Sequence, residues 1–162
     1  MRPSPVFPRL AAAALVALAA LSLLAVACGS GERERVEGLA RVRIGDLVID
    51  AEVPPMEAFG KGLGGRDSLA RDRGMLFVFP QVGTHAFWMK DMRFAIDIIW
   101  ISEDKRVVHL QADAPAPAPD APDSSLPVYM PGTGAKYVLE VNAGLAAEKG
   151  VRVGDTAEIE LP

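Results

Sequence analysis

A segment in the middle of the chain combines an aromatic surface with a positive charge. In residues 84–90, the alternation of a strand places Trp88 and Lys90 on one face. The opposite face, which we expect to belong to the core, carries His85, Phe87 and Met89. An indole ring beside an ammonium group suits a polar ligand such as a sugar or an anion. The alternative is that Trp88 only covers the sheet and that the Lys90 side chain extends over it.

Asp97 interrupts AIDIIWI, an otherwise apolar segment. A buried carboxylate destabilises a fold by several kcal/mol unless it is paired or hydrogen-bonded. We therefore expect a partner for Asp97, which is Arg93, Lys90 or a backbone turn. The carboxylate then belongs either to a structural pair or to a site.

Glu140 lies in a second apolar segment, KYVLEV. In a strand its side chain shares a face with Asn142, opposite Leu139 and Val141. We interpret Asn142 as the N-cap of a following helix, whereas Glu140 has no such explanation. Glu140 is therefore either a structural residue or a candidate site residue.

These residues support two functional hypotheses if they converge in one place. Trp88, Lys90, Asp97 and Glu140 would form a shallow polar site in a non-enzymatic ligand-binding or accessory module, with a small polar or glycan ligand. The alternative is an envelope glycan hydrolase, which requires the carboxyl groups of Asp97 and Glu140 within about 10 Å across one cleft. A third hypothesis is a structural partner protein, which a contiguous exposed apolar patch would indicate.

Other kinds of chemistry are not indicated by the residue types. The chain has no nucleophile motif, phosphate loop or HExxH motif. One cysteine and two histidines exclude a disulfide framework and argue against an ordinary zinc site. Four methionines could bind Cu(I) together with His85, namely Met75, Met89, Met92 and Met130. We interpret them instead as residues that fill the core. We predict no metal and no cofactor, and the pI near 5.2 argues against a nucleic-acid partner.

Residues 1–27 have the features of a secretory signal peptide. Arg2 and Arg9 precede an apolar stretch that ends in the small residues AVA, a cleavage site for signal peptidase. The next residue is Cys28, the only cysteine, and LLAVACGS resembles a bacterial lipobox, in which the cysteine becomes diacylated. We predict an exported lipoprotein anchored to the cell membrane or envelope through Cys28. Plain secretion and an uncleaved transmembrane anchor are the alternatives.

The mature chain would begin at Cys28 and would be more acidic than the whole sequence. Loss of Arg2 and Arg9 from 17 basic residues, against 21 acidic ones, leaves a net charge of −6. That charge suits a domain held away from an anionic membrane. Residues 28–38 are polar and charged and form the expected tether, and residues 39–162 form a single domain.

Short runs of β-branched and aromatic residues, separated by turn residues, predict a mainly β fold. ARVRI and LVIDAEV flank Gly45 and Asp46, a pair that suits a type II′ hairpin. The other strand-like runs are 74–80, 84–90, 95–101, 106–112, 136–141 and 156–161. We predict a β-sandwich or a partly open barrel of about eight short strands.

Helical signals are few and predict one or two short helices. The best segment is 143–149, which begins after Asn142 and ends at Gly150, and 56–63 is a weaker one. Residues 112–127 are rich in proline and aspartate and predict a surface loop. This loop belongs inside the domain because the chain after it is too short for an independent core.

Several segments, taken in order, resemble the domain of unknown function 192 family. They are GMLFVFP, HAFWMKDM, AIDIIWI, the Pro-rich loop, KYVLEVNAG and GVRVGD. The similarity runs from about Val42 to Glu160. It implies a compact, mostly β fold that is often exported or lipid-anchored and has no settled biochemical role.

The sequence departs from the family pattern in two places. The Pro-rich loop lacks the Cys-Pro pair that members often carry, so a redox or thiolate–metal role tied to that pair does not apply. GLGGR, residues 62–66, stands where the family tends to have a GLM-like element followed by an arginine. The methionine is missing, and we expect a looser backbone there.

Overall fold

The structure, a computed structural model, describes Met1 and residues 36–162. These residues form a seven-stranded sheet and a separate two-stranded sheet, β4 (Phe87–Trp88) with β7 (Val128–Tyr129). The strands of the large sheet are β1 (Ala40–Ile44), β2 (Leu47–Glu52), β3 (Arg73–Gly83), β5 (Ile96–Ile101), β6 (Val107–Ala114), β8 (Ala135–Asn142) and β9 (Ala157–Glu160). The mainly β fold class predicted from the sequence is confirmed.

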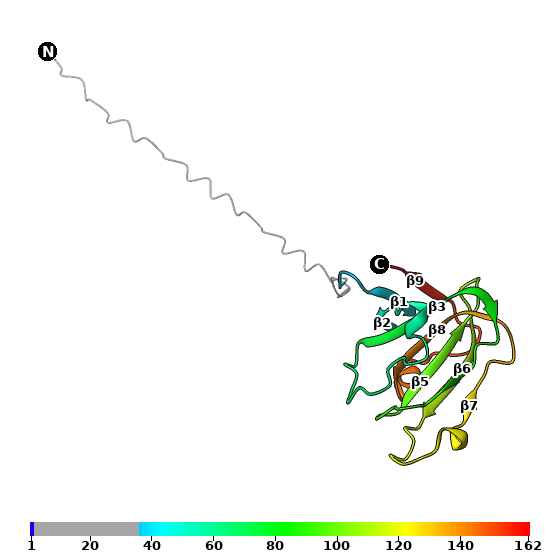
Figure 1. Cartoon of the computed structure of the whole chain (residues 1–162). Coiled ribbons are helices and arrows are strands. Elements are labelled where there is room, and N and C mark those ends of the chain that lie inside the picture. Colours follow the sequence, from blue (N-terminus) through cyan, green and yellow to red (C-terminus); the bar gives the residue numbers. More distant parts are fainter. Residues whose placement is uncertain (2–35) are drawn as a thin grey trace. The chain divides into compact units, whose positions relative to one another are not determined.

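The large sheet has the strand order β6-β5-β8-β3-β2-β1-β9, and all neighbours are antiparallel except β2 and β3. Its first hairpin turns at Gly45, which has φ 54° and separates the paired residues Ile44 and Leu47. The two edge strands approach each other at one end, where Val107 N–H donates to Asp155 O at 2.9 Å. The sheet therefore curls in the manner of a partly open barrel without closing (Figure 1).

Both faces of the sheet are covered by apolar side chains, and this explains the long apolar runs. Every residue of β5, the segment IDIIWI, is buried. Alternate residues such as Ile99 and Leu139 point into a first core, which also contains the apolar side chains of β1 and β2. Ile98 and Trp100 point into a second core on the other face. The candidate site lies on the side of the second core.

The helices are shorter than predicted. The segment 56–63 contains only a 3₁₀ turn, η1 (Met56–Ala58), and the segment 143–149 contains only α1 (Leu145–Glu148). The prediction that Asn142 caps this helix is wrong. Asn142 is the last residue of β8, and its Nδ2 donates to the carbonyl oxygens of Leu69 and Ala70, both at 3.1 Å.

The Pro-rich loop begins later than predicted, because residues 112–114 belong to β6 and Ala114 is buried in the second core. From there the chain runs without regular structure to a second 3₁₀ turn, η2 (Asp123–Ser125). The chain then enters β7, where Val128 pairs with Trp88. In Figure 1 the yellow segment with η2 and β7 lies at the end of the domain opposite β9. None of the helices that the structure describes is long and apolar enough to cross a membrane.

Candidate functional site

A pocket of about 240 Å³ opens on the side of the second core. Its wall combines the segment after η1, the end of β3, the β4 region and one residue of β8. The lining residues are Phe59, Gly60, Lys61, Gly62, Leu63, Phe79, Ala86, Phe87, Trp88, Lys90, Met92 and Glu140. Most of this surface is aromatic or aliphatic, with three charged side chains. A few polar groups in a largely apolar hollow are typical of small-molecule sites.

Glu140 is the buried charged residue of this pocket. The residue is 5% exposed, and its Oε2 has no hydrogen-bond partner among the residues that the structure describes. Burial raises the pKa of Glu140 to about 8, although the Arg66 guanidinium lowers it in part. At neutral pH the carboxyl group is therefore mostly protonated. An unpartnered buried carboxyl oxygen is costly, and a hydrogen bond to this group would offset that cost.

Arg66 does not pair with Glu140, because its guanidinium already has a partner. Its Nη1 and Nη2 donate to the two carboxylate oxygens of Glu52 at 2.6 and 2.8 Å. This bidentate geometry uses the planar fork of arginine fully. Arg66 acts on Glu140 only through its charge.

Gly62 lies directly against the Glu140 carboxyl group. A Cβ at this position would lie 3.6 Å from Oε2 of Glu140 and 3.3 Å from Cζ of Phe77. Gly62 also has φ 49°, a conformation that favours glycine. A side chain at this position would press against the Phe77 ring and the Glu140 carboxyl group.

The glycine segment that contains Gly62 is held firmly, contrary to the expectation of a looser backbone. Gly65 N–H donates to Asp91 O at 2.8 Å, and Gly64 N–H donates to Lys61 O at 2.8 Å. A Cβ on Gly64 would lie 3.1 Å from Lys90 O. Glycine is required here because the backbone packs closely against the segment after β4.

Three phenylalanines form the apolar wall. Phe79 packs edge to face against Phe59, with ring centroids 5.1 Å apart, and against Phe87, with centroids 6.4 Å apart. His85 stacks on Phe79 at 3.4 Å between centroids, so this histidine supports the wall and does not line the pocket. Edge-to-face packing holds neighbouring rings at different orientations.

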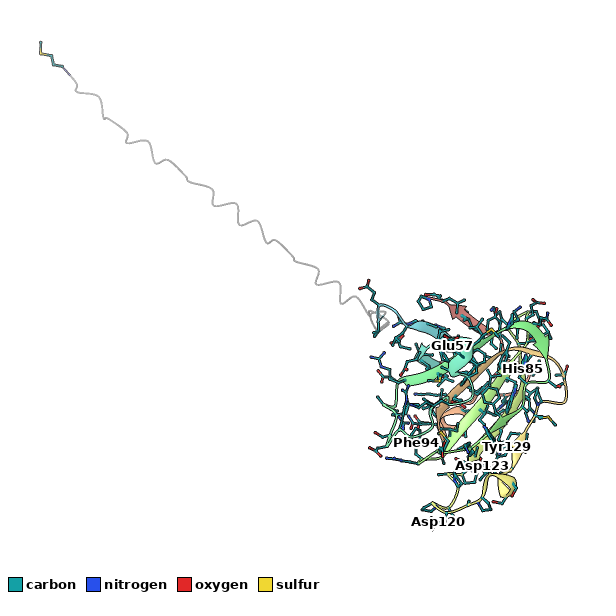
Figure 2. All side chains as sticks on the ribbon, in the orientation of Figure 1. Glu57, His85, Phe94, Asp120, Asp123 and Tyr129 are labelled. Atoms are coloured by element: carbon teal, nitrogen blue, oxygen red, sulfur yellow. The ribbon has the colours of Figure 1, made fainter. Side chains whose placement is uncertain are left out.

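Trp88 and Lys90 both lie at this pocket, but not through the strand alternation expected over residues 84–90. The strand there is only β4, and Phe87, expected on the opposite face, lines the same pocket. Trp88 is 42% exposed, and the Lys90 Nζ lies 5.6 Å from the centroid of its ring. Lys90 also forms an ion pair with Asp123, and this hydrogen bond raises the pKa of Lys90. Asp123, labelled in Figure 2, therefore connects the Pro-rich segment to the pocket.

Asp97 lies elsewhere, and the prediction that it joins Glu140 in one cleft is wrong. Its Oδ1 accepts hydrogen bonds from the N–H groups of Asp113 at 2.9 Å and Gly144 at 3.1 Å. Its Oδ2 accepts one from Ala146 N–H at 2.8 Å. Of the predicted partners, the backbone is the one observed, and Asp97 rather than Asn142 caps the start of α1. The structure thus unites Trp88, Lys90 and Glu140 but not Asp97.

The other candidate residues fall into the core or outside the described part of the chain, except Met130, which is exposed and does not fill the core as predicted. Met75, Met89 and Met92 are buried in the second core. Among the described residues, no group of three or more His, Cys, Asp or Glu side chains is placed to hold a metal ion. Cys28 lies outside the described residues.

Sequence patterns missed Phe59, Phe79 and Gly62 as pocket residues. Phe79 lies in a predicted strand, and nothing in that strand indicates contact with Phe59. The signal for Gly62 was the unusual density of glycine at residues 60–65. A glycine cluster without a phosphate-loop context indicates a close backbone approach, which is what the structure shows.

Comparison with known families identifies the fold family. Residues 41–159 match the model of domain of unknown function 192 (DUF192), described as "Uncharacterized ACR, COG1430". The chain belongs to this family. The match spans the whole DUF192 domain seen in the structure, including all the pocket residues.

Two solved structures resemble this DUF192 domain. One is a protein of unknown function from Novosphingobium aromaticivorans DSM 12444, with 29% identity, a TM-score of 0.63, and coverage of 77% of this chain and 89% of that chain. The other, from Sinorhizobium meliloti 1021, is described provisionally as a transcription regulator, with 27% identity, a TM-score of 0.60, and coverage of 80% and 98%. A search of the curated proteins finds no match.

Proposed function

We propose that this protein is a lipid-anchored module of the bacterial cell envelope that binds a small ligand in the pocket around Glu140 and is not an enzyme. The observation that carries the proposal is the Glu140 carboxyl group, which is buried in an aromatic pocket with one oxygen unpartnered. A ligand that hydrogen-bonds or pairs with this group would compensate for its desolvation. The lipobox-like segment that ends at Cys28 supports the anchoring.

The geometry favours binding over glycan hydrolysis. A glycosidase of the common kind places two carboxyl groups on either side of the bond to be cleaved, about 5–10 Å apart in one cleft. Asp97 and Glu140 do not share a cleft here, because Asp97 is buried against α1 in the first core. The pocket therefore contains one carboxyl group, that of Glu140, which can contact a ligand but does not form the pair that glycan hydrolysis requires.

The substitution Gly62→Ala tests the pocket as the ligand site. Its methyl group would occupy the space beside Glu140, whereas Gly65→Ala would meet nothing within 4 Å. Both glycines have positive φ, 49° and 79°, so both variants carry backbone strain and Gly65→Ala is the matched control.

Thermal shifts would be measured with sugars, peptidoglycan fragments, anions, metal ions and small ammonium compounds. We expect one class to stabilise the wild type and Gly65→Ala and to have no effect on Gly62→Ala. The proposal is wrong if no class stabilises the wild type. It is also wrong if the Gly62→Ala variant responds as strongly as the control.

A further inference from the structure

Glu140 has no direct ion-pair partner on the elements that pack against it, although the Arg66 guanidinium acts on it through its charge. Its cross-strand partners are Met75 on β3 and Ile98 on β5, which are both apolar. On the glycine segment it faces Gly62. An ionised Glu140 would therefore be a buried charge without a direct partner, a state that proteins avoid.

The cationic side chains near Glu140 are engaged with other groups or lie at the pocket surface. Arg66 is paired with Glu52, and Lys90 is paired with Asp123. Arg73, two residues before Met75 on β3, has its Nε 4.0 Å from Asp72, and its Nη1 is buried with no hydrogen-bond partner among the described residues. The cation that lowers the pKa of Glu140 is nevertheless Arg66 and not Arg73. Lys61 lines the pocket but is exposed to solvent. No cationic side chain therefore forms an ion pair with Glu140, and a bound cation could take that place.

The walls of the pocket suit such a cation. Phe59, Phe79, Phe87 and Trp88 supply aromatic rings, and ring faces attract cations within about 6 Å of the centroid. The pocket already shows this attraction once, because Lys90 Nζ lies 5.6 Å from the Trp88 ring centroid. Several rings and one carboxylate form a common arrangement for binding quaternary ammonium groups.

We propose that this pocket binds the methylated ammonium head group of a small molecule, with the Glu140 carboxylate as its counter-ion. The inference rests on the proposed function, since it names the ligand class of the same pocket. Among the side chains that line the pocket, Glu140 is the one hydrogen-bond acceptor. A methylated nitrogen is favoured over a primary ammonium group because it has few or no N–H groups that need an acceptor. The Lys61 and Lys90 side chains suit an anionic group on the outer part of the same molecule.

Neutral and anionic ligands fit the lining less well. A sugar carries hydroxyl groups that each need a hydrogen-bond partner when buried. The pocket offers three polar side chains for this purpose, two of them lysines that only donate. An anion beside Glu140 would be repelled by the ionised carboxylate, with little water to screen the charge, and would therefore bind only the protonated form.

Binding of a cation must be coupled to loss of the Glu140 proton. With a pKa of about 8, about a tenth of the molecules are ionised at pH 7 and about nine tenths at pH 9. The apparent affinity follows the fraction of binding-competent protein. We therefore expect binding to be about tenfold tighter at pH 9 than at pH 7, with release of about one proton at pH 7.

The test uses isothermal titration calorimetry at pH 7 and pH 9 with the full-length protein. The probes are tetramethylammonium, choline and glycine betaine, and 3,3-dimethylbutan-1-ol serves as the uncharged isostere of choline. The variants are Glu140→Gln and, as a matched control, Glu57→Gln, because Glu57 is exposed and does not line the pocket. Circular dichroism would be recorded to check that both variants are folded.

We expect at least one ammonium probe to bind. At pH 9 the isostere should bind at least about tenfold more weakly than choline, and Glu140→Gln should weaken binding of the ammonium probe by about the same factor. The Glu57→Gln control should bind like the wild type. The inference is overturned if the isostere binds as well as choline, if Glu140→Gln binds unchanged, or if none of the three ammonium probes binds. If another class of compound binds and Gly62→Ala blocks it, the ligand class is wrong and the proposed function stands.

Discussion

The side chains of Asp97 and Glu140 lie on opposite faces of one sheet. Ile98 pairs with Glu140 across β5 and β8, while Asp97 pairs with Val141, so the two carboxyl groups are one residue out of phase. Side chains of successive strand residues point to opposite faces. The two groups therefore have separate roles, one in holding the fold and one in the pocket.

Replacement of Asp97 should destabilise the fold without reaching the pocket. The Asp97→Asn side chain keeps one oxygen for the N–H groups that the carboxylate now binds, so at least one buried N–H loses its partner. We expect the free energy of unfolding to fall by about 1–3 kcal/mol. Urea unfolding measures this change, with Asp123→Asn as the exposed control, for which at most about 1 kcal/mol is expected. Equal effects of the two substitutions would contradict the structural role of Asp97.

Glu140 should make the domain less stable as the pH rises. Its pKa is raised from 4.5 to about 8 in the folded state, so between these values the folded chain binds more protons than the unfolded chain. The contribution of Glu140 is complete below pH 4.5 and is lost as the pH rises through 8. We expect a decline of a few kcal/mol over this range.

The Glu140→Gln variant should lack this decline, because its amide does not titrate. Urea unfolding at several pH values between 5 and 9 gives the two curves. Curves that run parallel through this range would show that Glu140 is ionised at neutral pH or equally solvated in both states.

Lys90 should affect how binding affinity depends on the charge of the ligand more than it affects stability. Its ion pair with Asp123 joins partly exposed groups, and such pairs contribute about 0–1 kcal/mol. We expect Lys90→Met to change the melting temperature little and to tighten choline binding about twofold, because one positive charge leaves the pocket. Calorimetry with choline measures this change. Glycine betaine, which carries a carboxylate, should not bind Lys90→Met more tightly than it binds the wild type. Weaker choline binding in Lys90→Met would contradict the position assigned to the cation.

Cys28 should determine where the protein is found in the cell. If this cysteine is acylated, the full-length protein will fractionate with membranes and Cys28→Ser will move to the soluble fraction. Globomycin should cause an unprocessed precursor to accumulate. Fractionation of the native host followed by immunoblotting tests both expectations, and membrane association of Cys28→Ser would show that another feature anchors the chain.

The positions of most strands could be predicted because local pattern determines them. Segments such as 136–141 alternate or run apolar between turn residues, and each of the predicted runs overlaps a strand of the structure. The alternation predicted for residues 84–90 does not extend over the segment, because β4 covers only Phe87–Trp88 and Phe87 lines the pocket together with Trp88 and Lys90. The helical segments were overestimated because α1 takes its cap from Asp97, 48 residues before Leu145, rather than from its own neighbour.

The sequence by itself determined that the domain is mainly β, that Cys28 has a lipobox-like context, and that Asp97 and Glu140 would need an explanation. Only the tertiary structure decided which explanation each carboxylate has. The register between β5 and β8 is a long-range property, and a shift of one residue would exchange the faces of a whole strand. The contact between Gly62 and Glu140 likewise joins segments far apart in the chain. Local residue patterns carry no information about such contacts, and the pocket depends on them.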